Sequence, residues 1–222
     1  MPTAMNPRRD SPHGPEHLRL DHVLVAVADL EAAAQWWRAE FGLGSVEGGR
    51  FSDGVESRVI PVGGEQYIEL LTVFELTDAS LPLRRVIDAG GGCVDWAVST
   101  ARIEAVASRL GREIERGSLT LADGTTSSWS YVFAEPGSQL PFYVQYDSPE
   151  RRPLLWEQRN AAANHERQPA GFAWLRTPSP SEKLAHWLGG ADLPVHAGDG
   201  SAVTFAVEMT DGRTVLFGTD SD

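Results

Sequence analysis

Residues 20–42, LDHVLVAVADLEAAAQWWRAEFG, decide the fold of this 222-residue chain. Residues 20–28 alternate bulky apolar with small or polar side chains, which is typical of a half-buried β-strand. Asp29 stands where the N-cap of a helix is expected, and Gly42 stands where that helix should end. Between them, apolar side chains recur at helical spacing at Leu30, Ala33, Trp37 and Phe41. The stretch therefore predicts a strand followed by an amphipathic helix.

The segments after this helix predict two copies of one pattern. Extended segments are expected over residues 46–51, 55–62 and 66–74, which completes a β-α-β-β-β order. The same order returns later, with its elements expected over residues 93–100 (strand), 103–110 (helix), and 113–121, 127–134 and 141–146 (strands). Asp123 and Gly124 should form a turn within this second copy. We predict an α+β fold built on paired β-α-β-β-β modules.

The rest of the chain is expected to add a tail, a connector and a third, partial module. The predicted parts are a disordered tail (1–17), one domain of two modules (18–147, with modules 18–75 and 93–147), a polar connector (148–170) and a third β-α-β-β-β-like module (171–218). The third module has Ala173 and Leu216 where the other two have polar residues. Its predicted role is therefore structural or in subunit contact.

Composition excludes several classes of partner. The chain has 19 basic and 31 acidic residues, a net charge of −12, and no basic run, so neither nucleic acid nor an anionic membrane surface is an expected partner. Cys93 is the only cysteine, which excludes a disulfide framework and fits a reducing cytoplasm. No apolar run resembles a signal peptide or a membrane span. The chain is expected to be cytoplasmic and to bind a small molecule.

Glu69 lies between aliphatic residues in the last strand of the first module. Because side chains alternate along a strand, Tyr67 and Glu69 should share one face, leaving the opposite face for the helix. A carboxylate in this position needs a cation, a hydrogen-bond donor or water. His22, in the first strand, is its natural complement. Two interpretations stay open: part of a divalent-metal site, or a hydrogen-bonded polar pair in a solvated cleft.

The second module offers Asp95 and Gln145 in the corresponding strands. If the modules pair, these two side chains meet His22 and Glu69 in one cavity. The parity argument places Tyr143 on the face of Gln145.

Other side chains are candidates for binding a substrate. Trp129, Tyr131 and Tyr143 are expected to stack on a flat or cationic ligand, or else to belong to the core. Arg58 is expected either to bind an anionic group or to lie at a solvated strand edge. There is no glycine-rich phosphate loop, so no nucleotide cofactor is expected.

The two copies together resemble the vicinal oxygen chelate superfamily, which includes glyoxalase I, extradiol dioxygenases and bleomycin-resistance-type binding proteins. In the first copy the resemblance rests on His22-Val-Leu-Val-Ala-Val-Ala-Asp-Leu-Glu and on Tyr-Ile-Glu69-Leu. The second copy, with Trp96-Ala-Val and Pro-Phe-Tyr-Val-Gln145-Tyr, and the third, with Ala-His-Trp-Leu-Gly-Gly, are more particularly similar to the glyoxalase-like domain proteins of this superfamily. The resemblance covers about residues 19–218.

The resemblance implies two modules whose sheets curl around a shared cavity, with metal ligands on the first and last strands of each module. Carried over, the ligands are His22, Glu69, Asp95 and Gln145, and the metal would be Zn, Ni, Co, Mn or Mg. Asp95 and Gln145 depart from the usual types, which are His or Gln at the first position and Glu at the second. The departures disfavour an extradiol iron site and weaken a glyoxalase I assignment. The resemblance also implies a homodimer.

Two hypotheses of function follow. The first is a metal-dependent isomerase or lyase acting on a small oxygen-bearing molecule, in which Glu69 is the catalytic residue that moves a proton. The second is a metal-free protein that binds and sequesters a small molecule against its aromatic residues.

Overall fold

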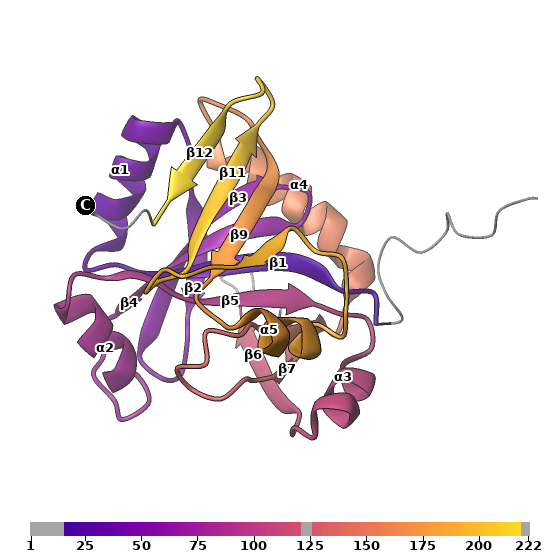
Figure 1. Ribbon diagram of the computed structural model, residues 1–222. Helices are drawn as coiled ribbons and strands as arrows, with labels where there is room; N and C mark the ends of the chain where they lie inside the picture. The colour runs from indigo at the N-terminus through magenta and orange to yellow at the C-terminus, as the bar shows by residue number, and fades with distance from the viewer. Residues whose placement is uncertain (1–15, 121–125, 219–222) are drawn as a thin grey trace, which may run out of the picture.

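The computed structural model describes residues 16–120 and 126–218, which fold into two β-sheets with helices around them (Figure 1). The larger sheet has eight strands in the order β2-β3-β4-β1-β5-β8-β7-β6, and the smaller has four in the order β10-β9-β11-β12. The predicted α+β fold of paired modules is confirmed.

The first module has the predicted β-α-β-β-β order. Its elements are β1 (Arg19–Ala26), α1 (Leu30–Phe41), β2 (Val46–Arg50), β3 (Val55–Gly63) and β4 (Gln66–Val73). Asp29 caps α1 by accepting a hydrogen bond from the backbone N–H of Ala32 at 2.8 Å. Gly42 ends the helix with a φ of 73°, a left-handed conformation that favours glycine. The local signals in residues 20–42 therefore act as predicted.

The second module repeats this order after a short linking helix. The elements are α2 (Leu81–Asp88), β5 (Gly92–Ser99), α3 (Ile103–Leu110), β6 (Glu115–Thr120), β7 (Thr126–Val132) and β8 (Phe142–Tyr146). The predicted turn at Asp123 and Gly124 lies outside the described residues. In each module the first strand pairs in parallel with the last, and β1 pairs antiparallel with β5. The two modules thus form one sheet with approximate two-fold symmetry.

The eight-stranded sheet is curled, so that its two outer strands approach each other. Gly49 on β2 faces Leu119 on β6, and a Cβ atom at Gly49 would lie 2.3 Å from a methyl carbon of Leu119. A side chain at this position would therefore have to displace that of Leu119. The curl gives the sheet a concave face and a convex face.

The smaller sheet covers the convex face. Its module contains β9 (Pro169–Thr177), α5 (Ser181–Trp187), β10 (Val195–Ala197), β11 (Thr204–Met209) and β12 (Thr214–Phe217). The element order is that of the other modules, but β9 pairs in parallel with β10, the strand that follows the helix directly. Buried residues of both sheets form one core, among them Trp96, Tyr143, Leu175 and Phe205.

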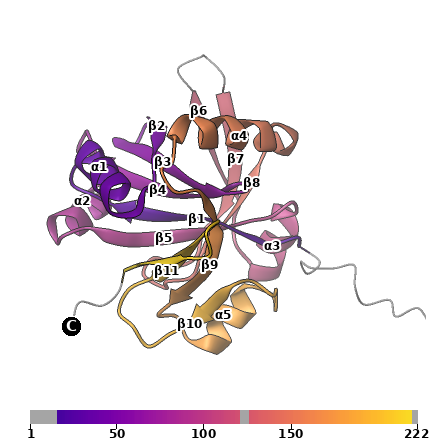
Figure 2. The same cartoon turned by 90° about the horizontal axis from the view of Figure 1, so that it is seen from above.

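The predicted polar connector is largely helical. It forms the short helix η1 (Pro149–Arg151) and α4 (Arg152–Ala163), and Figure 2 shows α4 on the side of the large sheet opposite the small sheet. After α4, His165 accepts a hydrogen bond at Nδ1 from the backbone N–H of Gly44 at 3.0 Å. Arg38 of α1 donates to the carbonyl oxygen of Ala163 at 2.9 Å. These bonds hold the end of α4 against the first module.

Most of the predicted tail, residues 1–15, lies outside the described residues, but Glu16 forms an ion pair with Arg109 at 2.8 Å. Within the parts of the chain that the structure describes, no helix has the length and apolar character needed to span a membrane.

Candidate functional site

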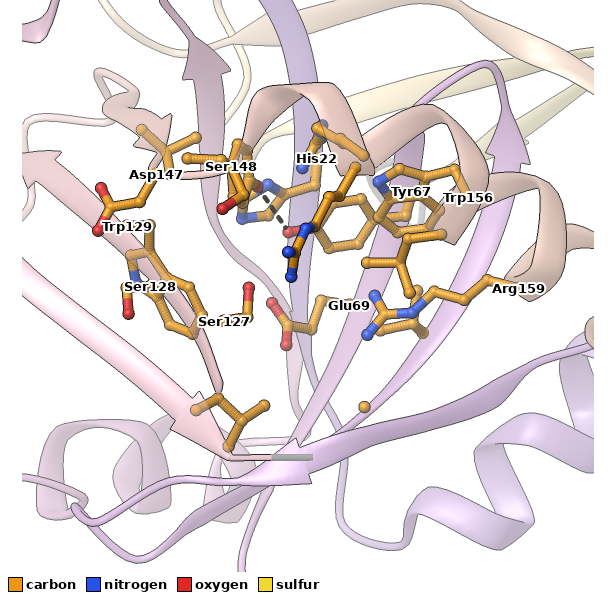
Figure 3. Close-up of a pocket in the computed structure, with 18 of the residues that line it drawn as sticks. His22, Tyr67, Glu69, Ser127, Ser128, Trp129, Asp147, Ser148, Trp156 and Arg159 are labelled. Carbon is orange, nitrogen blue, oxygen red and sulfur yellow. Dashed lines mark hydrogen bonds between the residues drawn. The ribbon is translucent and has the colours of Figure 1, made fainter. Parts of the chain in front are cut away.

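A cavity of about 500 Å³ lies between the concave face of the large sheet and the η1–α4 segment (Figure 3). Strands of both modules contribute to its wall. The lining side chains that carry charge, hydrogen-bonding groups or aromatic rings include His22, Tyr67, Glu69, Trp129, Tyr131, Tyr146, Arg151, Arg152, Trp156 and Arg159. It is the cavity that the two-module pattern predicts, closed on one side by a helix that the pattern does not predict.

A β-bulge in β1 places two neighbouring side chains together. Leu20 pairs with Val98 and His22 pairs with Ala97, so that Asp21 is an extra residue without a partner on β5. In a regular strand, adjacent side chains point to opposite faces. Here an oxygen of Asp21 lies 2.7 Å from Nδ1 of His22, and both residues are buried.

Asp21 is the centre of a buried polar network. Arg152 of α4 donates to its second oxygen at 2.7 Å, and the Tyr146 hydroxyl donates to the first at 2.9 Å. Arg152 also pairs with Glu65 at 2.7 Å. Burial by itself raises the pKa of Asp21, but the charge of Arg152 and the hydrogen bond from His22 hold that pKa below its ordinary value. Asp21 is therefore an anion that accepts hydrogen bonds.

This network decides which nitrogen of His22 is available for chemistry. Because Asp21 is an ionised acceptor, Nδ1 of His22 carries the proton that they share. Nε2 has no hydrogen bond to any residue in the described ranges. The ring stacks on Tyr67 with 4.4 Å between the ring centroids, and Tyr67 stacks in turn on Trp156 of α4 at 4.6 Å. These contacts hold the ring and leave Nε2 without a hydrogen-bond partner among the described residues.

Glu69 lines the same cavity as His22, and Figure 3 shows its carboxylate near the middle of the view. Its neighbours Ile68 and Leu70 are fully buried in the core on the opposite face, as the alternation predicts. Glu69 forms no hydrogen bond or ion pair with the residues that the structure describes. The carboxylate is therefore free to act on a ligand.

Asp95 does not line the cavity. Its side chain accepts a hydrogen bond from the backbone N–H of Trp96 at 2.8 Å, and burial raises its pKa to about 6. The strand register explains the displacement, since His22 lies opposite Ala97 and Asp95 lies opposite Leu24.

Gln145 and Tyr143 share one face of β8, as the alternation predicts, but that face points away from the cavity. The prediction that they line the cavity is therefore wrong, and the alternate residues of the strand face it. Oε1 of Gln145 accepts a hydrogen bond from the backbone N–H of Ile103 at 2.8 Å, at the start of α3. Tyr143 is fully buried in the core, where its hydroxyl donates to the carbonyl oxygen of Trp187 at 2.6 Å. Val144 and Tyr146 line the cavity instead.

The register also shows which residues of the second module correspond to His22 and Glu69. Tyr67 pairs with His22, and Phe142 pairs with Ala97 in the same way. Ala97 is therefore the counterpart of His22, and Phe142 is the counterpart of Tyr67. Glu69 lies two residues after Tyr67, so its counterpart is Val144, two residues after Phe142. Both counterparts lack metal-binding atoms.

The residues present therefore do not fit the metal site that the resemblance implies. Such a site takes ligands from both modules, whereas only His22 and Glu69, both from the first, reach this cavity among the four predicted ligands. Across residues 16–120 and 126–218, no group of three or more His, Cys, Asp or Glu side chains is arranged to hold a metal ion. Two protein donors are fewer than the three or four that hold a resident zinc ion.

The predicted substrate-binding residues divide between the cavity and other places. Trp129 and Tyr131 line the cavity, with ring centroids 6.0 Å apart. Arg58 does not, because it pairs with Glu31 at 2.9 Å and donates to the hydroxyl of Ser45 at 3.2 Å.

Sequence reasoning missed the contributions of Asp21 and of α4. Asp21 was hidden because a regular strand would turn it away from His22. The helix α4 does leave signals, since Pro153 suits the first turn of a helix and Asn164 ends it with a φ of 49°. Its inward-facing residues Arg152, Trp156 and Arg159 recur at helical spacing.

Comparison with known proteins agrees with this fold. A family model described as a glyoxalase-like domain matches residues 20–191. No curated protein matches the chain.

Several solved structures are similar to part of this chain. A methylmalonyl-CoA epimerase of Streptomyces coelicolor, in complex with 2-nitronate-propionyl-CoA, is 20% identical over 57% of this chain and 95% of its own, with a TM-score of 0.45. The methylmalonyl-CoA epimerase from Mycobacterium tuberculosis is 21% identical over 58% and 86%, with a TM-score of 0.45. A hypothetical protein from Bacillus halodurans C-125 is 18% identical over 58% and 93%, with a TM-score of 0.43. The family model spans more than half of the chain, and this protein therefore belongs to the glyoxalase-like domain family.

Proposed function

We propose that this protein is an enzyme of the isomerase or lyase type that moves a proton on a small oxygen-bearing molecule, with Glu69 and His22 as its acid–base groups. One observation carries the proposal. A free carboxylate and an imidazole whose other nitrogen is bound by Asp21 line the same cavity. A base and an acid within one enclosed site are the minimum for proton transfer.

The two groups have distinct roles in the proposed reaction. Glu69 takes a proton from the carbon next to a carbonyl group, and the electron pair of that C–H bond moves toward the carbonyl oxygen. His22, protonated at Nε2, then gives a proton back to the substrate. The positive charge on the ring is stabilised by Asp21, as a buried carboxylate stabilises an imidazolium. Exchange of one proton with solvent restores both groups.

No step of this reaction is assigned to a metal ion, because the cavity offers only two of the predicted ligands. We expect the protein purified without chelator to hold less than stoichiometric metal by elemental analysis. Its melting temperature should be unchanged by a panel of divalent ions. Near-stoichiometric metal that is lost in His22→Ala would contradict this part of the proposal and restore the metal-dependent mechanism.

Proton exchange tests the proposed activity without knowledge of the natural substrate. Small carbonyl compounds are incubated with the protein in D₂O, and deuterium incorporation next to the carbonyl group is followed by NMR. We expect incorporation into at least one compound, reduced at least about 100-fold in His22→Gln. His186 lies on α5 outside the cavity, and His186→Gln should match the wild type. Equal rates in all three proteins would contradict the role of His22.

The aromatic lining supports a second candidate, a protein that sequesters its ligand without changing it. Trp129, Tyr131 and Trp156 all line the cavity, and aromatic rings stack well on flat ligands. On this hypothesis a ligand quenches tryptophan fluorescence, yet no compound that binds exchanges a proton. The cytoplasmic location and the homodimer stay predictions under both candidates.

A further inference from the structure

We propose that Arg159 of α4 forms a binding subsite for the carboxylate group of a small organic monoanion. The inference rests on the proposed function, because it names the class of substrate that Glu69 and His22 would act on. The subsite lies on the connector helix, outside the two β-α-β-β-β modules.

Arg159 is a cation that lines the cavity and has no ion pair or hydrogen bond among the described residues. Its guanidinium lies 5.0 Å from the ring centroid of Trp156, and it forms no ion pair or hydrogen bond with any side chain or backbone group in the described ranges. Figure 3 shows it extending from α4 toward the part of the cavity where Glu69 lies. Burial lowers the pKa of Arg159, although the negative charge of Glu69 acts in the opposite direction.

Two other arginines line the cavity, and neither is an unpaired cation removed from water, since Arg151 is exposed to solvent. Arg152, two helical turns away, also lines the cavity, but it pairs with Asp21 and with Glu65, both at 2.7 Å. The charge of Arg152 is thus balanced within the protein. The charge of Arg159 is available for a ligand, and a planar guanidinium binds carboxylates and phosphates through paired hydrogen bonds.

The other charges of the cavity favour a monoanion over a dianion. Glu69 and Asp147 also line it, and each repels a negative ligand, whereas Arg151 is exposed and its positive charge is screened by solvent. A carboxylate brings one negative charge, whereas a phosphate monoester brings nearly two at neutral pH. The aromatic walls suit a flat body attached to the carboxylate. These features together indicate a flat carboxylate whose charged end meets Arg159 and whose reacting carbon faces Glu69.

Three probes of similar shape test the charge of the ligand. Benzoate, benzamide and phenyl phosphate are titrated into the full-length protein at pH 7.5, and binding is measured by calorimetry and by tryptophan fluorescence. Benzoate should bind at least about tenfold more tightly than the other two. Equal binding of benzamide would remove the case for an anion subsite, and tighter binding of phenyl phosphate would assign the subsite to a dianion.

Two arginine variants place the subsite. Arg159→Gln should weaken benzoate binding at least about tenfold, and Arg159→Lys should weaken it less because the charge remains. Arg176 is the matched control, since its guanidinium lies 5.5 Å from the ring centroid of Trp174 on the small sheet, away from the cavity. Arg176→Gln should bind benzoate like the wild type. Unchanged affinity in Arg159→Gln would overturn the proposal. If that variant does not fold, the comparison of Arg159→Lys with the wild type decides, and equal affinity again overturns it.

Glu69→Gln separates the failure of this inference from the failure of the proposed function. Loss of a like charge should leave benzoate binding intact or strengthen it, whereas proton exchange should be lost. Arginine-dependent binding with no exchange in any compound would support the subsite and overturn the enzyme. Exchange that depends on Glu69 while benzoate binding is independent of Arg159 would support the enzyme and overturn the subsite.

Discussion

At the scale of single residues, the site depends on charges that are buried but balanced. Asp21 and Arg152 are both buried, and each would be costly alone in the protein interior. Together with His22 and Tyr146 they satisfy one another's hydrogen bonds. The network also connects α4 to β1, so that the position of His22 and the packing of the helix depend on the same ion pair.

Loss of Arg152 alone should lower the free energy of unfolding more than loss of both Arg152 and the charge of Asp21. Arg152→Met leaves Asp21 buried without its cation, and we expect a loss of about 3–5 kcal/mol in the free energy of unfolding. Adding Asp21→Asn to Arg152→Met should recover part of that loss, because the unpaired charge is removed. Urea unfolding at pH 7.5 measures both. A double variant less stable than Arg152→Met would contradict the pairing.

Asp95 should make the fold less stable as the pH rises. Its pKa is about 6 in the folded state, against an ordinary value of 3.8, because burial disfavours the charged form. The stabilising contribution of protonated Asp95 is fully present below pH 3.8 and is lost as the pH rises through 6, a change of about 2–3 kcal/mol. Asp95→Asn should therefore stabilise the protein at pH 7.5 relative to the wild type and leave it unchanged near pH 4. Thermal unfolding across this range checks the sign, and equal stability of the two proteins at pH 7.5 would contradict it.

At the scale of elements, the sequence predicted regular structure better than its exceptions. The cap at Asp29, the glycine that ends α1 and the alternation in β4 all depend on local chemistry, and each could be predicted. The bulge at Asp21 depends on the pairing of β1 with β5, which no local pattern reports. Which face of β8 lines the cavity depends on the register of β8 with β5. Without that register, the sequence pattern predicted Gln145 in the cavity, where the structure places Val144. Long-range pairing therefore decided the part of the site that was not predicted.

The anchoring of α4 should depend on pH through His165. Burial and the nearby charge of Arg38 lower the pKa of His165 to about 4, from an ordinary value of 6.5. The neutral ring is the form that accepts the bond from Gly44, so this contribution is present above pH 6.5 and is lost as the pH falls toward 4. After allowance for solvent screening, the change is on the order of 2 kcal/mol. His165→Gln should flatten the fall in melting temperature between pH 6.5 and 4.5, and an identical fall in both proteins would contradict it.

At the scale of the whole molecule, an approximately symmetric sheet encloses an asymmetric site. The first module supplies the groups that can react, His22 and Glu69. The second supplies aliphatic residues at the corresponding positions, Ala97 and Val144, and the aromatic lining residues Trp129, Tyr131 and Tyr146. The small sheet covers the convex face and α4 covers the concave one (Figure 2). In the proposed function, both modules shape the cavity and the first one carries the chemistry.

The pairing of β5 with β8 predicts which residue of β8 could be changed to add a metal ligand to the cavity. The alternation counted from the sequence alone predicts the other residue. Val144→Glu should place a third donor beside His22 and Glu69, and the variant should gain a thermal shift with Zn²⁺ or Ni²⁺ that the wild type lacks. Gln145→Glu is the matched control, since that side chain points to α3. A metal-dependent shift in Gln145→Glu but not in Val144→Glu would contradict the assigned correspondence.

The central claim, that Glu69 moves a proton in this cavity without a bound metal ion, is tested most directly by deuterium exchange in the presence of a chelator. The compound that exchanges fastest with the wild type is measured with Glu69→Gln and with Glu104→Gln, whose side chain lies on the exposed surface of α3. We predict that EDTA leaves the wild-type rate unchanged, that Glu104→Gln keeps it, and that Glu69→Gln loses at least about 100-fold. A wild-type rate abolished by EDTA, or a Glu69→Gln variant as fast as the wild type, would contradict the claim.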